Sequence, residues 1–411
     1  MEIRHTHKEI PCVERKFRLA DFIRLNWDKY AEHPTEPIRP EQYKAVNAIR
    51  VCRTAALGVD TYVCPECGEV SEIYHSCKNR FCPTCSWRDT MLWAERVKKQ
   101  MLNIPHRHVV MTLPHLLNPL IKRNGKELLN VLMKTSADRE TMKDWIENKY
   151  SLKAGVISVL HTFGEKKNYH VHVHMIVTWG GIHKSTGELV EIQSPYVRVS
   201  FLQKKFREKF RERLNFMYKY GILKHDFRND DEFADFKRSM YQSCWTINLE
   251  PPMKIPSQVI CYIGRYSKRA CLSEYKITAI EGEYISFRYK DYRSSPDKHN
   301  PEEKILTLHY SEFFPRLLQH VPLPYFRIVR YYGVYSHKST VPEEYLYQED
   351  TKEPCTDTVE NESEYENPYY CKPCQRYKIY HCTTLVRHGT NNKEPECLVF
   401  QRPELVKRKV A

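Results

Sequence analysis

The segment from Tyr169 to Val177 alternates histidine with apolar residues, and it constrains the fold more than any other stretch of the chain. Side chains on an extended strand alternate between its two faces, so His170, His172 and His174 are predicted to share one face. The residues between them are predicted to face an apolar layer. Three imidazoles at this spacing favour a metal site over a half-buried strand whose polar face is histidine by chance.

A second strand is predicted immediately before the histidine strand. Residues 155–163 are mostly apolar and β-branched, and a short turn at 164–168 would join the two strands as a β-hairpin. In that hairpin His161 is predicted to lie roughly opposite His172. An imidazole from the neighbouring strand would complete a metal site with open positions, although His161 could instead be a structural histidine with local hydrogen bonds.

Two Cys-x-x-Cys pairs in the first hundred residues predict a structural zinc site. The expected ligands are the four cysteines of these pairs: Cys64, Cys67, Cys82 and Cys85. His75 and Cys77 lie between the pairs and are doubtful candidates for a substitute ligand or a partial site. The chain does not open with a signal peptide, and its cysteines cluster in such pairs, so zinc in a reducing compartment is expected rather than a disulfide framework.

The charge of the chain favours a polyanionic partner. Lys and Arg number 65 against 51 Asp and Glu, which gives a net charge of +14. Nucleic acid or a membrane surface would suit this excess, although charge alone is also compatible with an ordinary basic protein. The 28 tyrosines offer rings on which bases can stack. No apolar run is long enough to span a bilayer, so a membrane-spanning protein is not expected.

Several motifs together resemble the two-tyrosine rolling-circle transposases of bacterial insertion sequences, which share the HUH endonuclease core. The segments that carry the resemblance are 52–58, 76–83, 110–114, 160–164, 170–174 and 262–266. The match spans roughly residues 15–335, and these motifs in this order are specific. Val171 stands where proline is usual, and Phe81 stands where histidine is usual. Neither departure removes a group that the family uses in catalysis.

The resemblance implies a catalytic divalent metal, Mg²⁺ or Mn²⁺. His172 and His174 would be the HUH pair, and His161 would complete the ligand set. His170 falls just before the pair, which makes it doubtful as a ligand and suggests a supporting or DNA-facing role. The resemblance also implies a structural Zn²⁺ in an N-terminal domain, single-stranded DNA at transposon ends and at the target as the partner, and a location in the bacterial cytoplasm.

Tyr262 and Tyr266 resemble the nucleophile pair of the same family. They are four residues apart on a helix predicted over 256–269, so their phenols would lie on one helical face. Arg265, Lys268 and Arg269 flank the two tyrosines and are candidate phosphate contacts. Lys78 and Arg80, near the predicted zinc site, are candidate DNA contacts as well. For the last two, an ordinary solvated face is equally compatible. Cleavage would form a 5′-phosphotyrosine and release a 3′-hydroxyl. A replication initiator or relaxase with the same chemistry, or a non-catalytic zinc-dependent DNA-binding protein, is an alternative.

The overall expectation is an α+β protein with three parts. Residues 1–100 would form a helical and zinc-binding domain, and residues 101–335 an HUH core with an antiparallel sheet flanked by helices. This core would end in basic strands, including an aromatic one at 326–333 that suits single-stranded DNA. Residues 336–411 would hold an acidic flexible linker at 342–367 and a tail. In that tail Cys371 and Cys374, with His381 and Cys382 nearby, are either a small second zinc site or a chance cluster.

Overall fold

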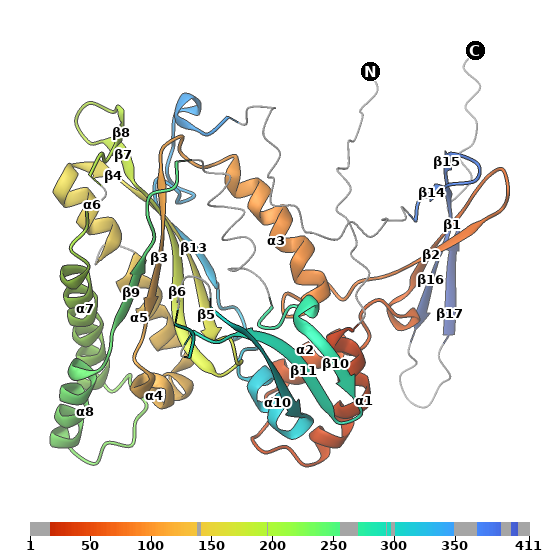
Figure 1. Ribbon diagram of the computed structural model, residues 1–411, viewed down its shortest axis with the longest axis horizontal. Helices are drawn as coiled ribbons and strands as arrows, with labels where there is room; N and C mark the ends of the chain where they lie inside the picture. Colours follow the sequence, from red (N-terminus) through yellow and green to blue (C-terminus); the bar gives the residue numbers. More distant parts are fainter. Residues whose placement is uncertain are drawn as a thin grey trace.

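The computed structural model describes residues 17–137, 141–194, 196–254, 270–292, 294–296, 301–348, 368–387 and 396–401. The predicted nucleophiles Tyr262 and Tyr266, and the neighbouring Arg265, Lys268 and Arg269, lie outside these residues. Within the described ranges the chain is α+β, as predicted, with antiparallel sheets and flanking helices (Figure 1). No helix in this part of the chain is long and apolar enough to cross a membrane.

A five-stranded antiparallel sheet forms the centre of the molecule, in the order β13-β5-β6-β3-β9. Its strands are β3 (His106–Thr112), β5 (Gly155–Phe163), β6 (Tyr169–Thr178), β9 (Thr246–Leu249) and β13 (Val329–Gly333). The side chains of β6 alternate between the two faces of the sheet, as predicted. Val171 and Val173 are buried in an apolar layer on one face. That layer is covered by helices α5 (Gly125–Ala137) and α7 (Val199–Lys219). The histidines of β6 therefore face the opposite side of the sheet.

Helix α3 (Pro83–Lys98) covers only part of that opposite side. Trp93 and Val97 of α3 pack in one cluster with Val159 of β5 and Ile176 of β6. These strand residues lie on the same face as His161 and His174, two positions away along each strand. The helix thus closes one end of this face, and the histidines occupy the other end.

The N-terminal helices pack against a later part of the chain. Helices α1 (Leu19–Glu32) and α2 (Pro40–Arg50) share one apolar core with a three-stranded sheet and helix α10 (Tyr310–Leu318). The strands are β10 (Ile277–Glu281), β11 (Tyr284–Lys290) and β12 (Glu303–His309). In this core the rings of Phe22 and Phe313 meet edge to face at 5.3 Å. This packing crosses the domain boundary predicted at residue 100.

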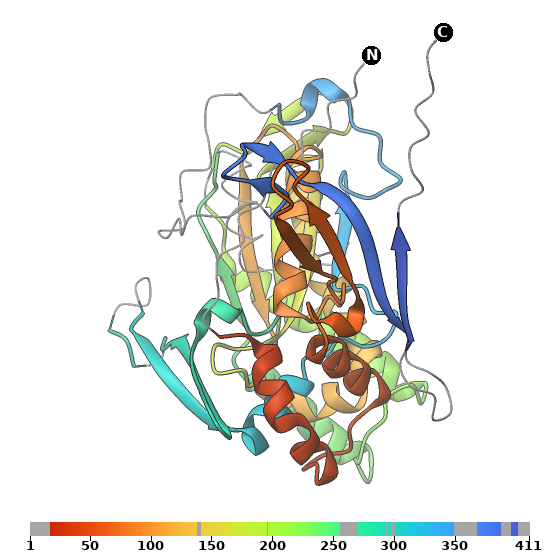
Figure 2. The same cartoon turned by 90° about the vertical axis from the view of Figure 1, so that its right-hand side faces the viewer.

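Strands from the N-terminal and C-terminal parts of the chain meet in an outer sheet of order β17-β16-β1-β2 (Figures 1 and 2). It combines β1 (Val59–Val63) and β2 (Val70–Tyr74) with β16 (Ile379–Arg387) and β17 (Glu396–Gln401). The pairing of β1 with β16 joins positions more than three hundred residues apart, such as Val63 and Ile379. The C-terminal segment, predicted as a tail, therefore contributes half of this sheet.

Residues 342–348, predicted as part of a flexible linker, are bonded to the loop after α3. The amide of Asn103 donates to the carbonyl of Tyr345 at 2.8 Å, and the amide of Tyr347 donates to the carbonyl of Met101 at 2.8 Å. The remaining described elements are α4 (Asn118–Arg123), α6 (Met142–Tyr150), α8 (Asp230–Gln242), β4 (Leu152–Lys153), β7 (Gly180–His183), β8 (Leu189–Glu191), β14 (Tyr370–Cys371), β15 (Arg376–Tyr377) and the short 3₁₀ turns η1 (Ala55–Leu57), η2 (His115–Leu117), η3 (Glu274–Lys276) and η4 (Glu343–Tyr345).

Candidate functional site

Three imidazoles converge on the open end of the central sheet. His161 of β5 and His172 of β6 are directly paired in the ladder, which confirms the predicted hairpin register. One ring nitrogen from each of His161, His172 and His174 lies within 4.8 Å of the others. The Nε2 atoms of His172 and His174 are 3.1 Å apart. A single cation could contact all three side chains, which are the residues expected from the sequence.

Hydrogen bonds hold two of these rings in the orientation that a metal ligand needs. His172 Nδ1 is 2.9 Å from the carbonyl oxygen of His170, and since a carbonyl only accepts, Nδ1 carries the proton. Nε2 of His172 then keeps its lone pair. His174 Nδ1 is 2.9 Å from Nε2 of His108, a buried residue on β3. A His174 ring protonated at Nδ1 donates to His108 and likewise leaves Nε2 as the ligand atom.

Burial favours the neutral, ligand-competent form of His172 and His174. Desolvation, and then the charge of His161, lowers the pKa of His172 and His174 well below 6.5. The same two causes lower the pKa of His108 to about 4, so it is neutral at pH 7 and can accept a hydrogen bond from Nδ1 of His174. Sequence reasoning missed His108, and the one available signal was the alternation of histidine at 106 and 108 in β3.

His170 lies at the margin of the cluster. Its Nδ1 atom is 3.0 Å from Nε2 of His115, which belongs to the 3₁₀ turn η2. It is not one of the three residues whose ring nitrogens converge. The alternation rule correctly put it on the same face of β6, but the contact with His115 turns its ring nitrogen toward another element.

A cavity of about 570 Å³ opens beside His161. Its lining includes four cationic side chains, Arg39, Arg80, Lys122 and Arg327. Phe163 and Tyr169 add aromatic surface, and Glu36 and Asp89 are acidic residues at its wall. Ala270, the first described residue after the segment that contains the predicted tyrosines, also lines it. This combination of cations and rings suits a phosphate backbone with unstacked bases.

Arg80 and Lys78, the two cations predicted near the zinc site, differ in position. The Arg80 guanidinium donates to the carbonyls of Leu323 at 3.3 Å and Phe326 at 3.2 Å, so it also anchors the chain before β13. Burial lowers its pKa, although the group stays charged in the physiological range. Lys78 is exposed, has a positive φ of 50°, and is not among the residues that line the cavity. The lining residue Lys122 was not predicted as a site residue, whereas Arg327 lies in the 326–333 segment that was predicted to suit single-stranded DNA.

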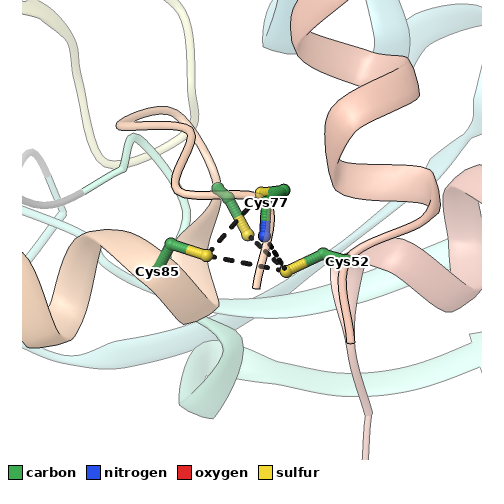
Figure 3. Close-up of side chains that lie close together, drawn as sticks. Cys52, Cys77 and Cys85 are labelled. Carbon is green, nitrogen blue, oxygen red and sulfur yellow. Dashed lines mark hydrogen bonds between the residues drawn. The ribbon is translucent and has the colours of Figure 1, made fainter. Parts of the chain in front are cut away.

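The first cysteine cluster lies where α2, the β1–β2 hairpin and α3 meet. One sulfur from each of Cys52, Cys77, Cys82 and Cys85 lies within 4.8 Å of the others, and Figure 3 shows how three of them converge. The Sγ atom of Cys85 is 3.6 Å from that of Cys52 and 3.6 Å from that of Cys77. Sulfurs on a tetrahedral zinc with bonds of about 2.3 Å are about 3.8 Å apart, so the spacing fits four-thiolate zinc.

This arrangement corrects the predicted ligand grouping. Cys82 and Cys85 do share a cluster, but Cys64 and Cys67 lie elsewhere, with Cys371 and Cys374. The β1–β2 hairpin separates the two pairs. The five extended residues of β1 span about 17 Å, so the turn at 64–67 lies at the tip of the hairpin, far from its base. Cys52 and Cys77 flank the base of the hairpin, beside the start of α3. Cys77, held doubtful, belongs to the group, and Cys52 was missed as a ligand.

His75, the other doubtful residue, is not in either cysteine group. Its Nε2 atom is 3.0 Å from a carboxylate oxygen of Asp60, and its Nδ1 atom is 3.1 Å from the carbonyl oxygen of Leu57. The carbonyl must accept, so Nδ1 carries a proton and the ring joins η1 to β1. His75 therefore connects backbone and carboxylate near the hairpin base.

Comparison with known proteins decides the family. A family model described as "Transposase zinc-binding domain" matches residues 22–113, and a second, described as "Putative transposase", matches residues 155–342. A protein of Sinorhizobium fredii, "Putative transposase y4qJ", is 31% identical over 323 residues, which cover 77% of this chain and 79% of that protein. The chain belongs to the IS91 family of insertion-sequence transposases.

A second relative of the transposase points the same way. The "Transposase for insertion sequence element IS801" of Pseudomonas savastanoi pv. phaseolicola is 27% identical over 316 residues, covering 73% of this chain and 72% of that protein. No solved structure matches the transposase. The matched zinc-binding domain contains the whole Cys52 cluster, which supports a structural zinc there. It also contains Cys64 and Cys67 but not Cys371 or Cys374.

Two buried histidines outside the three-imidazole group should make the stability of the transposase depend on pH. Burial lowers the pKa of His106 and of His320 from 6.5 to about 3. Below pH 6.5 the unfolded chain binds protons at these positions and the folded chain does not. Stability is therefore full above pH 6.5 and falls as the pH drops toward the folded pKa, by up to about 1.4 kcal/mol per pH unit for each histidine.

The variant that isolates this effect is His320→Gln. His320 donates from Nε2 to the carbonyl of Lys167 at 3.0 Å and accepts at Nδ1 from the hydroxyl of Thr162 at 3.0 Å, and a glutamine can keep an amide donor there without titrating. Urea unfolding at pH 7.5, 6.5 and 5.5 should show a shallower loss of stability for the variant than for the unmodified protein. Equal slopes for the two proteins would contradict the assignment.

Proposed function

We propose that this transposase cuts and rejoins single-stranded DNA through a tyrosine nucleophile, with the His161, His172 and His174 group as its metal-binding centre. The observation that carries the proposal is the convergence of these three imidazoles beside a cationic cavity. The family assignment supplies DNA as the substrate class and favours a transposase over the replication initiator or relaxase considered above. The chemistry below follows from these residues.

The donor set fits a divalent cation. Three imidazoles on two paired strands leave coordination positions for water and phosphate, as catalytic metal sites require. Imidazole suits several transition metals, and Mg²⁺ or Mn²⁺ is what the family resemblance implies. A cation held there would polarise the scissile phosphate and orient it for attack. His172 and His174, with their second nitrogens bonded to His170 and His108, keep the site rigid.

Tyr262 or Tyr266 is the proposed nucleophile. A phenol with a pKa near 10 is mostly protonated at pH 7, so nearby positive charge must favour the phenolate. The phenolate oxygen forms a bond to phosphorus while the bond from phosphorus to the 3′ oxygen breaks. The phenolic proton goes to solvent, and the departing 3′ oxygen takes one up. The product is a 5′-phosphotyrosine with a free 3′-hydroxyl, and the reverse attack rejoins the strand without ATP.

The cavity beside His161 is the proposed path of the DNA strand. Arg39, Lys122 and Arg327 can contact successive phosphates, and Phe163 and Tyr169 can stack against bases. Stacking on such rings needs unpaired bases, which favours a single strand over a duplex. Ala270, the first described residue after the segment with the two tyrosines, lines the same cavity as His161.

The test is a covalent adduct. The purified transposase is incubated with Mg²⁺ or Mn²⁺ and single strands that tile the DNA on both sides of its coding region. Strands labelled at the 3′ end should yield a labelled protein band that resists denaturation. Strands labelled at the 5′ end should instead yield a shortened fragment with an extendable 3′-hydroxyl.

The double variant Tyr262→Phe with Tyr266→Phe should give no adduct. Tyr275→Phe, at an exposed tyrosine just after the segment, is the matched control and should react normally. An adduct that survives the double change would refute the tyrosine assignment. If no strand gives an adduct with the unmodified protein, the proposed cleavage is wrong and a non-catalytic DNA-binding role is favoured.

A further inference from the structure

We propose that Cys64, Cys67, Cys371 and Cys374 bind a second structural zinc ion, which fastens the C-terminal segment to the zinc-binding domain. Cys371 and Cys374 lie beyond both regions matched by the transposase family models, which end at residues 113 and 342. The site is separate from the Cys52 cluster and does not depend on the proposed cleavage chemistry.

The sulfur geometry is that of a tetrahedral thiolate site. One sulfur from each of the four cysteines lies within 4.8 Å of the others. The Sγ atoms of Cys67 and Cys371 are 3.6 Å apart. That distance is close to the separation of about 3.8 Å expected on zinc with bonds of about 2.3 Å. It is far longer than a disulfide bond of about 2.05 Å.

Both cysteine pairs lie on short turns that are followed by a residue in the left-handed region, and the two turns close with different backbone hydrogen bonds. Each Cys-x-x-Cys pair is followed by a residue in the left-handed region, Gly68 with a φ of 74° and Gln375 with a φ of 53°. The amide of Gly68 donates to the carbonyl of Cys64 at 3.0 Å, and that of Gln375 donates to the carbonyl of Lys372 at 3.4 Å. A non-glycine residue at positive φ is uncommon, so Gln375 marks a constrained turn.

Each turn also stands at the tip of a β-hairpin. The first connects β1 to β2, and the second connects β14 to β15. Two knuckles on facing hairpins, each giving two thiolates, are the usual construction of a four-cysteine zinc site. More than three hundred residues separate the two cysteine pairs along the chain. Spacing alone groups Cys-x-x-Cys pairs that are close in sequence, so it could not group these two.

The surrounding structure brings the two tips together without the metal. β1 pairs with β16, so Val63 just before the first turn lies opposite Ile379 just after the second hairpin. The Lys378 ammonium, whose side chain is 3% exposed, contacts Glu69 at 2.9 Å and the hydroxyl of Ser71 at 2.6 Å. The other carboxylate oxygen of Glu69 is 3.0 Å from the Sγ atom of Cys371, so Glu69 links this buried cation to the cysteine group.

His381 and Cys382, considered as partners of Cys371 and Cys374, are not in the group. They lie within β16, where Cys382 is buried and paired with Thr61 of β1. The partners come instead from the N-terminal hairpin. A zinc shared between the two ends of the chain would therefore hold β16 and β17 against β1.

Zinc content of the full-length protein tests the proposal. Metal analysis of protein purified without added zinc should give two zinc ions per chain. The variant Cys371→Ser with Cys374→Ser should give one, whereas Cys244→Ser, at an exposed cysteine outside both groups, should give two. Hydrogen exchange should speed up in β1 and β16 of the double variant and stay slow in α1 and α10.

A ligand exchange keeps the test decisive if the serine variants do not fold. Cys374 is only partly buried, so Cys374→His can place an imidazole at the same corner. In cobalt-substituted protein, the thiolate-to-cobalt absorption of this variant should be weaker and its ligand-field bands should be shifted. Both changes are expected when one of four thiolates is replaced by an imidazole. A single zinc in the unmodified protein, two zincs in the double serine variant, or an unchanged cobalt spectrum in Cys374→His would each overturn the proposal.

Discussion

Replacing His172 with alanine is expected to lower the rate of single-strand cleavage at least about a hundredfold, since loss of a residue supporting a metal already costs 10–100-fold in comparable sites. His172 is paired with His161 across the hairpin, and its Nε2 atom is 3.1 Å from that of His174. Removing it leaves two imidazoles, which hold a cation less tightly and leave it free to shift. Single-turnover cleavage over a range of Mn²⁺ concentrations should show both a lower maximal rate and a higher Mn²⁺ concentration for half of that rate.

His170→Ala is the matched control, because it removes an imidazole from the same face of the same strand. The ring of His170 packs against that of His172 at 5.0 Å between centroids, but its ring nitrogen contacts His115 and is not one of the three that converge. Cleavage by His170→Ala should therefore stay within a few-fold of the rate of the unmodified protein. Thermal unfolding of both variants would show whether either change acts through stability. Equal losses for the two variants, or full activity for His172→Ala, would contradict the assignment of the metal site.

The histidine site shows what local periodicity can predict. Alternation in β6 and the short turn before it were enough to predict that His161 lies opposite His172, because a hairpin register depends only on neighbouring residues. The involvement of His108 depends on how β3 pairs with β6, and sixty-six residues separate His108 from His174. No local pattern encodes that pairing.

The cysteine sites show where the same reasoning fails. Spacing alone grouped Cys64 and Cys67 with Cys82 and Cys85, because all four lie within a short stretch. The β1–β2 hairpin separates them, and the C-terminal strands return to β1 to supply the missing partners. Likewise, the packing of α1 and α2 against residues 271–321 could not be read from the amphipathic pattern of either helix. A pattern shows which face is apolar and does not show what covers it.

Replacing Cys52 with serine is expected to remove one zinc ion and to unfold the N-terminal part of the transposase. Cys52, Cys82 and Cys85 are buried in the same core as Phe22 and Leu272, so this site supports a core and not only a turn. Zinc binding in small four-ligand sites contributes about 10–16 kcal/mol, and a domain is stable by only about 5–15 kcal/mol. Losing even half of that contribution leaves little net stability.

The expected readout is a large loss of soluble protein or a melting transition lowered by more than about 10 °C, with Cys244→Ser unchanged as control. The effect should exceed that of Cys371→Ser, because Cys371 and its partners lie outside the three apolar cores whereas three cysteines of the first cluster lie within one. Added zinc should rescue neither variant, since the serine hydroxyl is a poor replacement for a thiolate. A Cys52→Ser protein with its full zinc content and an unshifted melting transition would show that the remaining thiolates suffice, and that the buried core is stable without this ligand.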